Sequence, residues 1–391
     1  MAVAPRIAII GAGLGGTTAT ILLQQAGYRV KVYEQAPVLG RLGAGINLSP
    51  NVTRILDRIG ILDTLSDIGC LPRERIRRDW DTGRITYAFP VDQFRELYGA
   101  PHLIVHRGDL QDALTAALQP GALELGKRLV EAEEKSTGTT LTFADGSTTE
   151  ADIVIGADGI NSRLREILLG PEPPIYTGEV AYRGIFPRTL IGDLHVPDHT
   201  KWTAPDGTHI LIYCMTKARD EIYFVTGVLE PDWGSDNYNP QTADLTRMRS
   251  YFTGFHPEVR TVLAACPAAT RWPILERAPL PLWSRGRIVL LGDACHPMRP
   301  HMGQGAAMAM EDAAMLSRCI EHYRGQNPDA IYRLYEAQRV ERTSKVQLIS
   351  QGNDWMRTGG DAGWLLGYDV INIPLVLPQA GAAQQATAAG V

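Results

Sequence analysis

The stretch "RIAIIGAGLGGTTATILLQQAGYRVKVYEQA", residues 6–36, decides how the fold of this sequence is interpreted. An apolar strand, Ile7–Ile10, leads into the spacing G-x-G-x-x-G, formed by Gly11, Gly13 and Gly16. In such a turn the first glycine permits the tight turn, the second lets the backbone approach a pyrophosphate, and the third lets helix and strand pack closely. The N-terminus of the next helix offers free N–H groups to the phosphates. The pattern predicts a strand–turn–helix unit that binds a dinucleotide.

A second strand, Tyr28–Tyr33, follows the helix and ends at Glu34. Glu34 comes 23 residues after Gly11, close to the spacing of roughly 20 residues at which an acid accepts a hydrogen bond from an adenosine ribose. A glycine-rich turn alone is weak evidence, because such turns also occur for packing. With two strands, a helix and an acid in this order, the dinucleotide interpretation is favoured.

Two further turns follow apolar strands. In "ADIVIGADGINSRLRE" the strand Ile153–Ile155 precedes Asp158 and Gly159, and Asn161 or Ser162 is expected to cap the next helix. The strand is apolar on both faces, which is typical of the core of a parallel sheet.

The third turn begins with "RIVLLGDA", which ends at Asp293, and Gly303 and Gly305 then start a helix of small residues. Between them lie two histidines. His296, beside a proline, is interpreted as a structural histidine, whereas a functional role is favoured for His301.

Composition limits the other possibilities. The chain has 391 residues, of which 45% are hydrophobic and 21% charged, as in a soluble globular enzyme. The net charge of −5 leaves no basic surplus for phosphate backbones, so no nucleic-acid partner is expected. Oligomeric state is not indicated.

The five cysteines are scattered and never form a C-x-x-C pair. This argues against a disulfide framework and against a metal site, and it favours a cytoplasmic location. The apolar stretch 362–378 is interrupted by Asp369 and Pro374, so no membrane span is expected. The tail 379–391 is expected to be disordered.

Residues 177–274 read as alternating strands, and 208–228 read as a hairpin with its turn near Lys217–Asp220. A period of two places His209 and Tyr213 on one face, which Tyr223 on the partner strand can share. Half-buried packing is a strong alternative for Tyr223, whereas two polar aromatic positions on one face favour function for His209 and Tyr213. Residues 78–89 read as a strand–turn–strand that joins the same layer.

The three turns GAGLGG, GADG and GDACHP with GQG, in this order, resemble the single-component flavoprotein aromatic hydroxylases, the group A FAD monooxygenases, over nearly the whole chain. The resemblance implies that the first turn holds the FAD pyrophosphate. It implies that Asp158 and Gly159 lie near FAD and the visiting nicotinamide cofactor, that Asp293 binds the ribityl chain, and that Arg107 in "IVHRGDL" contacts FAD. Pro300–Met302 would wall the reaction chamber, with the helix from Gly303 directed at the flavin ring.

The implied fold is α/β: a Rossmann-like FAD-binding domain, interleaved with a β-sheet substrate domain, plus a C-terminal helix. The expected segments are FAD-binding domain 1–75, 99–176 and 275–353; substrate domain 76–98 and 177–274; and C-terminal segment 354–391.

The implied activity is hydroxylation of a small hydroxylated aromatic or pyridine carboxylic acid, such as 6-hydroxynicotinate, with or without decarboxylation. FAD would be the bound cofactor, NADH or NADPH the reductant and molecular oxygen the co-substrate. His209, Tyr213 and His301 are the candidates for the proton relay. The alternatives are a salicylate or hydroxybenzoate hydroxylase, an FAD-dependent reductase or dehydrogenase without oxygen chemistry, and a non-catalytic interaction protein that retains a relic nucleotide pocket.

Within the family the resemblance is closest to hydroxylases of a pyridine acid, whose active-site pattern matches His209, Tyr213, Tyr223 and His301. At two positions the chain departs from that pattern, with Asn47 in place of a histidine and His199 in place of a cysteine. An amide donates and accepts hydrogen bonds but does not become cationic. Asn47 is therefore expected to orient a substrate group; the alternative is that it stabilises its own turn beside Ser49.

Overall fold

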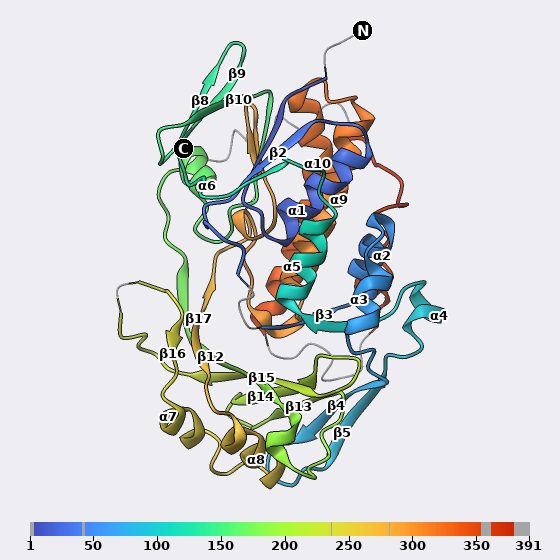
Figure 1. Cartoon of the computed structure of the whole chain (residues 1–391), viewed down its shortest axis with the longest axis vertical. Coiled ribbons are helices and arrows are strands. Elements are labelled where there is room, and N and C mark those ends of the chain that lie inside the picture. The colour runs from blue at the N-terminus through green and yellow to red at the C-terminus, as the bar shows by residue number, and fades with distance from the viewer. Residues whose placement is uncertain (1–3, 41–43, 236, 281, 353–360, 379–391) are drawn as a thin grey trace.

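The structure, a computed structural model, describes residues 4–40, 44–235, 237–280, 282–352 and 361–378. The tail 379–391, expected to be disordered, lies outside the described residues. Figure 1 shows a helix-rich upper region and a sheet-rich lower region along the long axis. Within the described ranges, no helix combines the length and apolar character needed to cross a membrane.

The upper region is built on a six-stranded sheet in the order β18-β19-β11-β1-β2-β7, parallel except for β18. Its strands are β1 Ile7–Ile10, β2 Val30–Tyr33, β7 Leu123–Glu124, β11 Ile153–Gly156, β18 Ser284–Arg285 and β19 Ile288–Leu290. Ile10 pairs with Gly156, and Gly156 with Leu290. The carboxyl ends of β1, β11 and β19 therefore lie side by side, and the three glycine turns that follow them meet at one edge of the sheet. Ligands of open α/β sheets bind at this edge.

Helices cover this sheet and extend to its right in Figure 1. They are α1 Leu14–Gln25, α2 Pro50–Ile59, α3 Leu62–Ile68, α4 Phe94–Tyr98, α5 Arg107–Ala116, α6 Arg163–Leu169, α9 Gly305–His322, α10 Pro328–Gln351 and α11 Gly363–Leu366. Small antiparallel pairings complete the region: β3 Gly45–Leu48 with β6 Leu103–His106, and β8 Leu129–Lys135, β9 Gly138–Phe143 and β10 Thr148–Ala151 in one sheet.

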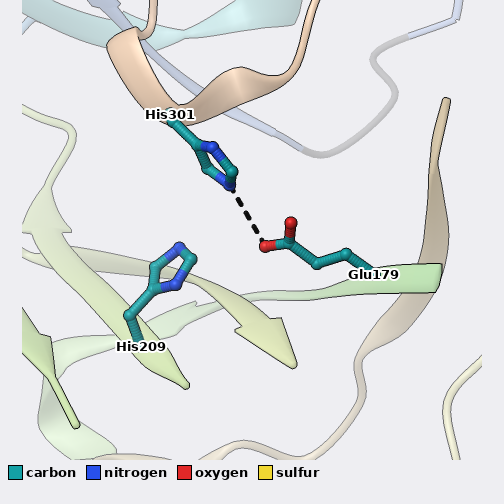
Figure 2. A group of neighbouring side chains, drawn as sticks. All are labelled: Glu179, His209 and His301. Atoms are coloured by element: carbon teal, nitrogen blue, oxygen red, sulfur yellow. Dashed lines mark hydrogen bonds and ion pairs between the residues drawn. The ribbon is translucent and has the colours of Figure 1, made fainter. Parts of the chain in front are cut away.

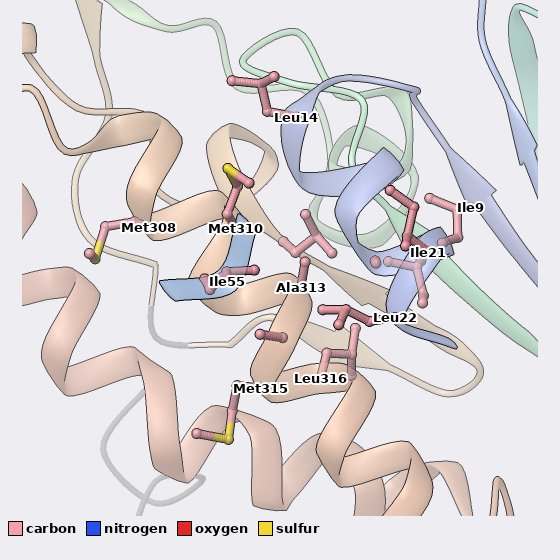
Figure 3. Packing of buried hydrophobic residues seen from close by; sticks show 14 of the residues in the cluster. Ile9, Leu14, Ile21, Leu22, Ile55, Met308, Met310, Ala313, Met315 and Leu316 are labelled. Atoms are coloured by element: carbon pink, nitrogen blue, oxygen red, sulfur yellow. The ribbon is translucent and has the colours of Figure 1, made fainter. Parts of the chain in front are cut away.

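Helix α9 lies at the centre of this region between α1 and α10, and its small residues let it be buried on nearly all sides. Figure 3 shows the packing, with Leu22 of α1 close to Leu316 of α9. Two buried acids of α9, Glu311 and Asp312, form ion pairs with the fully buried Arg339 of α10. These pairs satisfy charges that would otherwise be costly to bury.

The lower region is an eight-stranded sheet in the order β16-β17-β12-β15-β14-β13-β4-β5. Its strands are β4 Glu74–Asp79, β5 Ile85–Pro90, β12 Ile175–Pro187, β13 His199–Thr203, β14 His209–Cys214, β15 Glu221–Leu229, β16 Gln241–Thr242 and β17 Thr270–Glu276. One face packs on α7 Leu245–Ser250 and α8 Pro257–Ala265 through residues such as Ile210 and Phe224. The other face is directed at the upper region (Figure 1). A short 3₁₀ helix, Arg188–Ile191, follows β12.

The predicted fold class is confirmed, since a sheet-rich layer interleaves in sequence with a Rossmann-like region and the helix α10 packs back on the latter. The predicted hairpin is β14–β15, with Tyr213 opposite Tyr223. Two boundaries were wrong. The strand expected from Tyr28 begins at Val30. The helix expected from Gly303 begins at Gly305, because Pro300–Met302 form a separate 3₁₀ turn that ends with Gly303 in the left-handed region, at φ +65°.

Candidate active site

A cleft of about 440 Å³ runs from the first glycine turn to the lower sheet. Its walls include six of the ten residues predicted to bind the cofactor, namely Gly13, Arg107, Gly159, Asp293, Gly303 and Gly305. The turns that supply these residues lie far apart in sequence. The parallel pairing of β1, β11 and β19 brings together the three turns that follow these strands.

Gly11 and Gly16, two more of the ten, close the first turn from behind. A Cβ on Gly16 would lie 2.0 Å from the carbonyl oxygen of Gly11, and a Cβ on Gly11 would lie 2.4 Å from that of Ala157. Gly11 also has a φ of +99°. Around Gly13, in contrast, no atom lies within 4 Å of an added Cβ, so its backbone is open to the cleft. This matches the division of tasks expected of a pyrophosphate-binding turn.

Two predicted acids hold the turns in shape. Glu34 accepts hydrogen bonds from the backbone N–H groups of Ala12 and Ala36, both at 2.9 Å. Asp158 accepts from the hydroxyl of Ser162 and from backbone N–H groups at the start of α6. Burial raises the pKa of Asp158, and these hydrogen bonds oppose the shift. The contacts stabilise the turns, and a direct contact with the cofactor stays a prediction for both acids.

Arg107 and Asp293 present opposite charges to the cleft. Each side chain opens onto the cleft but is otherwise surrounded by protein. Burial lowers the pKa of Arg107 and raises that of Asp293, and the attraction between the two opposes both shifts. An open glycine backbone at a helix start, a cation and an acid along one cleft fit a ligand that carries both pyrophosphate and hydroxyl groups. The residues therefore fit FAD.

A second cavity, of about 120 Å³, adjoins this cleft. It lies between the lower sheet and the 3₁₀ turn Pro300–Met302. Asn47, Leu211, Val225 and Gly303 line both the cavity and the cleft, so the two spaces are continuous. Because an apolar cavity of about 150 Å³ holds a benzene molecule, this one is of the size of a single aromatic ring.

Three side chains converge on one side of the cavity, as Figure 2 shows: His301 from the 3₁₀ turn, and Glu179 and His209 from β12 and β14. Nε2 of His301 lies 3.2 Å from Oε1 of Glu179, and the ring centroids of the two histidines are 5.8 Å apart. The Nδ1 atoms lie 3.0 Å from backbone carbonyls, of Ser350 for His301 and Gly207 for His209.

These contacts indicate which ring nitrogen of each histidine carries a proton. A carbonyl oxygen only accepts, so Nδ1 of each histidine donates. Nε2 of His301 faces Oε1 of Glu179, so a proton taken up by this pair would lie between these two atoms. Burial lowers the pKa of His209 well below 6.5, so its ring is neutral and its Nε2 carries a lone pair. The side of the cavity formed by these three residues can accept and store a proton.

Comparison with known proteins agrees with a flavin site. The profile of the family described as "FAD binding domain" matches residues 5–348. The chain belongs to this family. It is 52% identical, over 95% of its length and 97% of the relative's, to 6-hydroxynicotinate 3-monooxygenase of Bordetella bronchiseptica. It is 49% identical, over 98% of its length and 100% of the relative's, to 6-hydroxynicotinate 3-monooxygenase of Pseudomonas fluorescens.

Among solved structures, HpxO of Klebsiella pneumoniae, complexed with FAD and uric acid, is similar. Its TM-score is 0.79 at 29% identity, with 91% of this chain and 89% of that chain covered. The protein is thus a flavoprotein aromatic monooxygenase that binds FAD and uses NAD(P)H and molecular oxygen.

In this flavoprotein the predicted catalytic residues divide between the two spaces. His209, His301 and Asn47 line the cavity, whereas Tyr213 and Tyr223 line the cofactor cleft. The tyrosine ring centroids are 4.9 Å apart. Burial raises the pKa of both phenols, so both are neutral. A Cβ on Gly45 would lie 2.6 Å from the Tyr213 hydroxyl, so that glycine lets β3 pass against the ring. These positions place the two tyrosines beside the cofactor space.

Asn47 lies on β3, where it pairs with Ile104, and its side chain points between cavity and cleft. Its Oδ1 lies 3.3 Å from Nε2 of His102, and a hydrogen bond also links it to Tyr213. Ser49 and Pro50 do start α2, but the Ser49 side chain makes no capping bond. The Asn47 side chain therefore bridges the walls of the two spaces rather than holding its own turn.

Four residues of the cavity wall went unrecognised or unexplained in the sequence: Arg75, His102, Glu179 and His199. Arg75 carried a weak signal, because alternate residues of "RIRRD" fall on one face of a strand. For Glu179 and His102 the sequence contained no signal that distinguishes them from ordinary surface residues. His199 was recognised only as a departure from the family pattern. All five cysteines are free and buried.

Proposed function

We propose that this flavoprotein hydroxylates a pyridine carboxylic acid that carries a ring hydroxyl, 6-hydroxynicotinate being the first candidate. The observation that carries the proposal is the single-ring cavity, open to the cofactor cleft, with Glu179, His209 and His301 on one side. The two relatives at about half identity, both 6-hydroxynicotinate 3-monooxygenases, support the same substrate.

The cofactor supplies the redox chemistry. When bound, FAD takes electrons from NAD(P)H and delivers one oxygen atom of molecular oxygen to the substrate. Gly13, Gly159, Arg107 and Asp293 would hold it along the cleft, and Gly303 marks the point at which the cleft meets the cavity.

The protein prepares the ring for attack by an electrophilic oxygen. Loss of the proton from the ring hydroxyl, or from the lactam nitrogen, raises the electron density of the ring. Neutral His209 accepts a hydrogen bond from that group through Nε2 but, with its lowered pKa, does not keep the proton. The pair His301–Glu179 stores it, because a carboxylate there offsets the charge of the imidazolium.

The walls of the cavity also exclude water. The apolar residues that line it include Leu211, Val225, Ile274, Met302 and Phe89. Water exclusion protects the oxygen-transfer step from loss of the oxygen as hydrogen peroxide. Since nicotinate carries its carboxylate at C3, hydroxylation at this carbon releases carbon dioxide and gives a dihydroxypyridine.

A substrate panel tests the proposal. 6-Hydroxynicotinate, 3-hydroxybenzoate and salicylate are compared by NAD(P)H consumption, oxygen uptake and product mass. We expect 6-hydroxynicotinate to give stoichiometric oxygen uptake and a product that has lost the carboxylate. Oxygen uptake that yields only hydrogen peroxide with every substrate would refute it. NAD(P)H consumption without oxygen uptake would instead support the reductase alternative.

The variants Glu179→Gln and His301→Ala test the proton relay. Each is expected to slow hydroxylation by about 100-fold, the usual loss for a positioned acid–base group, and to raise the share of hydrogen peroxide. FAD content should stay normal, because neither residue lines the cofactor cleft. Full coupled activity in both variants would remove them from the relay.

A further inference from the structure

The cavity side of β4, β13 and β14 carries a row of basic side chains. Ile76 pairs with Thr200 and Arg77 with Lys201, so Arg75 is next to the strand position of His199. His199 in turn pairs with Tyr213, at the opposite end of β14 from His209. His209 and Tyr213 are four residue steps apart on the strand, and at about 3.3 Å per residue the two ends are about 13 Å apart. The basic end at Arg75 and the proton-storing end at His209 are thus separated along the strand.

Arg75 is a cation without a counterion. Its guanidinium lines the cavity and forms no hydrogen bond or ion pair with the residues that the structure describes. Burial, with Arg77 nearby, lowers its pKa to about 10. A buried charge without a partner is costly, and an anionic ligand removes that cost. Among the groups of a hydroxylated aromatic acid, only the carboxylate is an anion at neutral pH.

His199, at the same end of the cavity as Arg75, is a second polar group that lacks a hydrogen-bond partner among the described residues. Burial, and then the charge of Arg75, lower its pKa well below 6.5, so the ring is neutral and carries one N–H. Neither ring nitrogen has a hydrogen-bond partner among the described side chains and backbone. The ring stacks on Tyr213, with centroids 5.8 Å apart and planes within 6°. This N–H lacks an acceptor, and a carboxylate oxygen seated on Arg75 is an acceptor at this end of the cavity.

We propose that Arg75 and His199 form the subsite that binds the substrate carboxylate, with Arg75 as the anchor and His199 as a second donor. The proposal rests on the proposed function and specifies how the acid is oriented. With the carboxylate at Arg75, the opposite edge of the ring is directed at His209 and the pair His301–Glu179. Acids whose hydroxyl is para to the carboxylate, as in 6-hydroxynicotinate, then reach both ends, whereas ortho acids such as salicylate do not.

Binding to the oxidised holoenzyme tests the subsite without turnover. 6-Hydroxynicotinate and 2-hydroxypyridine, the same ring without the carboxylate, are titrated while the flavin absorbance or the heat of binding is followed. Arg75→Gln is expected to raise the Kd of 6-hydroxynicotinate about 10- to 100-fold, as for loss of a charged hydrogen bond, and to leave 2-hydroxypyridine unchanged. His199→Phe, which keeps a ring against Tyr213, should give a smaller increase with the same selectivity.

Arg78 provides the matched control. It lies on the same strand but on the opposite face, where its guanidinium approaches Glu258 at 3.6 Å and the ring of Trp202. Arg78→Gln should leave the affinities of both ligands as in the wild type. Arg75→Lys, which keeps the positive charge, should recover part of the affinity for the acid, and FAD content reports whether each variant is folded.

The outcomes separate the subsite from the proposed function. Equal weakening of both ligands in Arg75→Gln, or no weakening of either, overturns the subsite even if the wild type hydroxylates 6-hydroxynicotinate. If the wild type binds neither pyridine, the proposed function is wrong. The pair 3-hydroxybenzoate and phenol then replaces them, and the loss of carboxylate selectivity in Arg75→Gln is still the required result.

Discussion

Gly227→Ala is expected to damage catalysis although Gly227 contacts no reacting group. Gly227 lies on β15 opposite His209. A Cβ there would lie 2.1 Å from Cε1 of His209 and 2.5 Å from Oε1 of Glu179. Non-bonded carbon atoms approach to about 3.5 Å, so the imidazole has to move by roughly 1.4 Å. The φ of Gly227 lies outside the left-handed region, so alanine fits the backbone itself.

The size of the effect follows from that displacement. A misplacement of about 1 Å in a catalytic constellation can lower a rate about 100-fold, which corresponds to about 2.7 kcal/mol of activation free energy. We therefore expect kcat for hydroxylation to fall about 100-fold. The FAD content should not change, because Gly227 does not line the cofactor cleft. Oxygen uptake, NAD(P)H consumption and hydrogen peroxide are measured together, so that slow and uncoupled turnover are distinguished.

Gly184→Ala is the matched control. A Cβ on Gly184, on the neighbouring strand β12, would lie 2.5 Å from the ring of Phe224 and 2.7 Å from Sγ of Cys266, in the core away from the cavity. It should lower stability by about 1–3 kcal/mol, as overpacking does, and leave kcat near the wild-type value. The reasoning is refuted if Gly227→Ala keeps full coupled activity, or if Gly184→Ala is equally slow.

Three further predictions concern the cofactor and stability. Heat-denatured protein should release FAD rather than FMN, as chromatography of the released flavin shows; a colourless protein that FAD does not reconstitute would contradict the site. Arg339→Met removes a guanidinium from the buried carboxylates Glu311 and Asp312 and should lower the free energy of unfolding by about 3–5 kcal/mol in urea denaturation. Burial lowers the pKa of His102 from 6.5 to about 3, so only the unfolded chain is protonated between these values. The contribution of this neutral ring to the free energy of unfolding is complete above pH 6.5 and falls by about 1.4 kcal/mol per pH unit below it. His102→Gln should therefore remove this part of the pH dependence of the free energy of unfolding, measured by denaturation from pH 7 to pH 4.

The cofactor cleft was largely predictable from the sequence. Gly11, Gly13 and Gly16 follow one apolar strand at fixed spacing, and their tasks depend on the local path of the backbone. The strand–turn–helix units and the hairpin β14–β15 likewise follow from apolar periodicity within contiguous residues. The helix start was misplaced only at Gly303, where a glycine in the left-handed region separates two helical turns.

The substrate cavity was only partly predictable. Periodicity placed His209 and Tyr213 on one face, yet only the tertiary structure shows that the first lines the cavity and the second the cofactor cleft. Glu179 meets His301 across 122 residues of sequence, and Arg75 reaches the cavity because β4 pairs in parallel with β13.

The sequence by itself thus determined the glycine turns, the strand and helix types and the likeness to flavin hydroxylases, because these depend on neighbouring residues and their spacing. The tertiary structure decided which charged side chains share the cavity. That outcome depends on the register of strands far apart in the chain, and on how the eight-stranded sheet packs against the turn Pro300–Met302. Contacts of this kind have no signature in any single stretch of sequence.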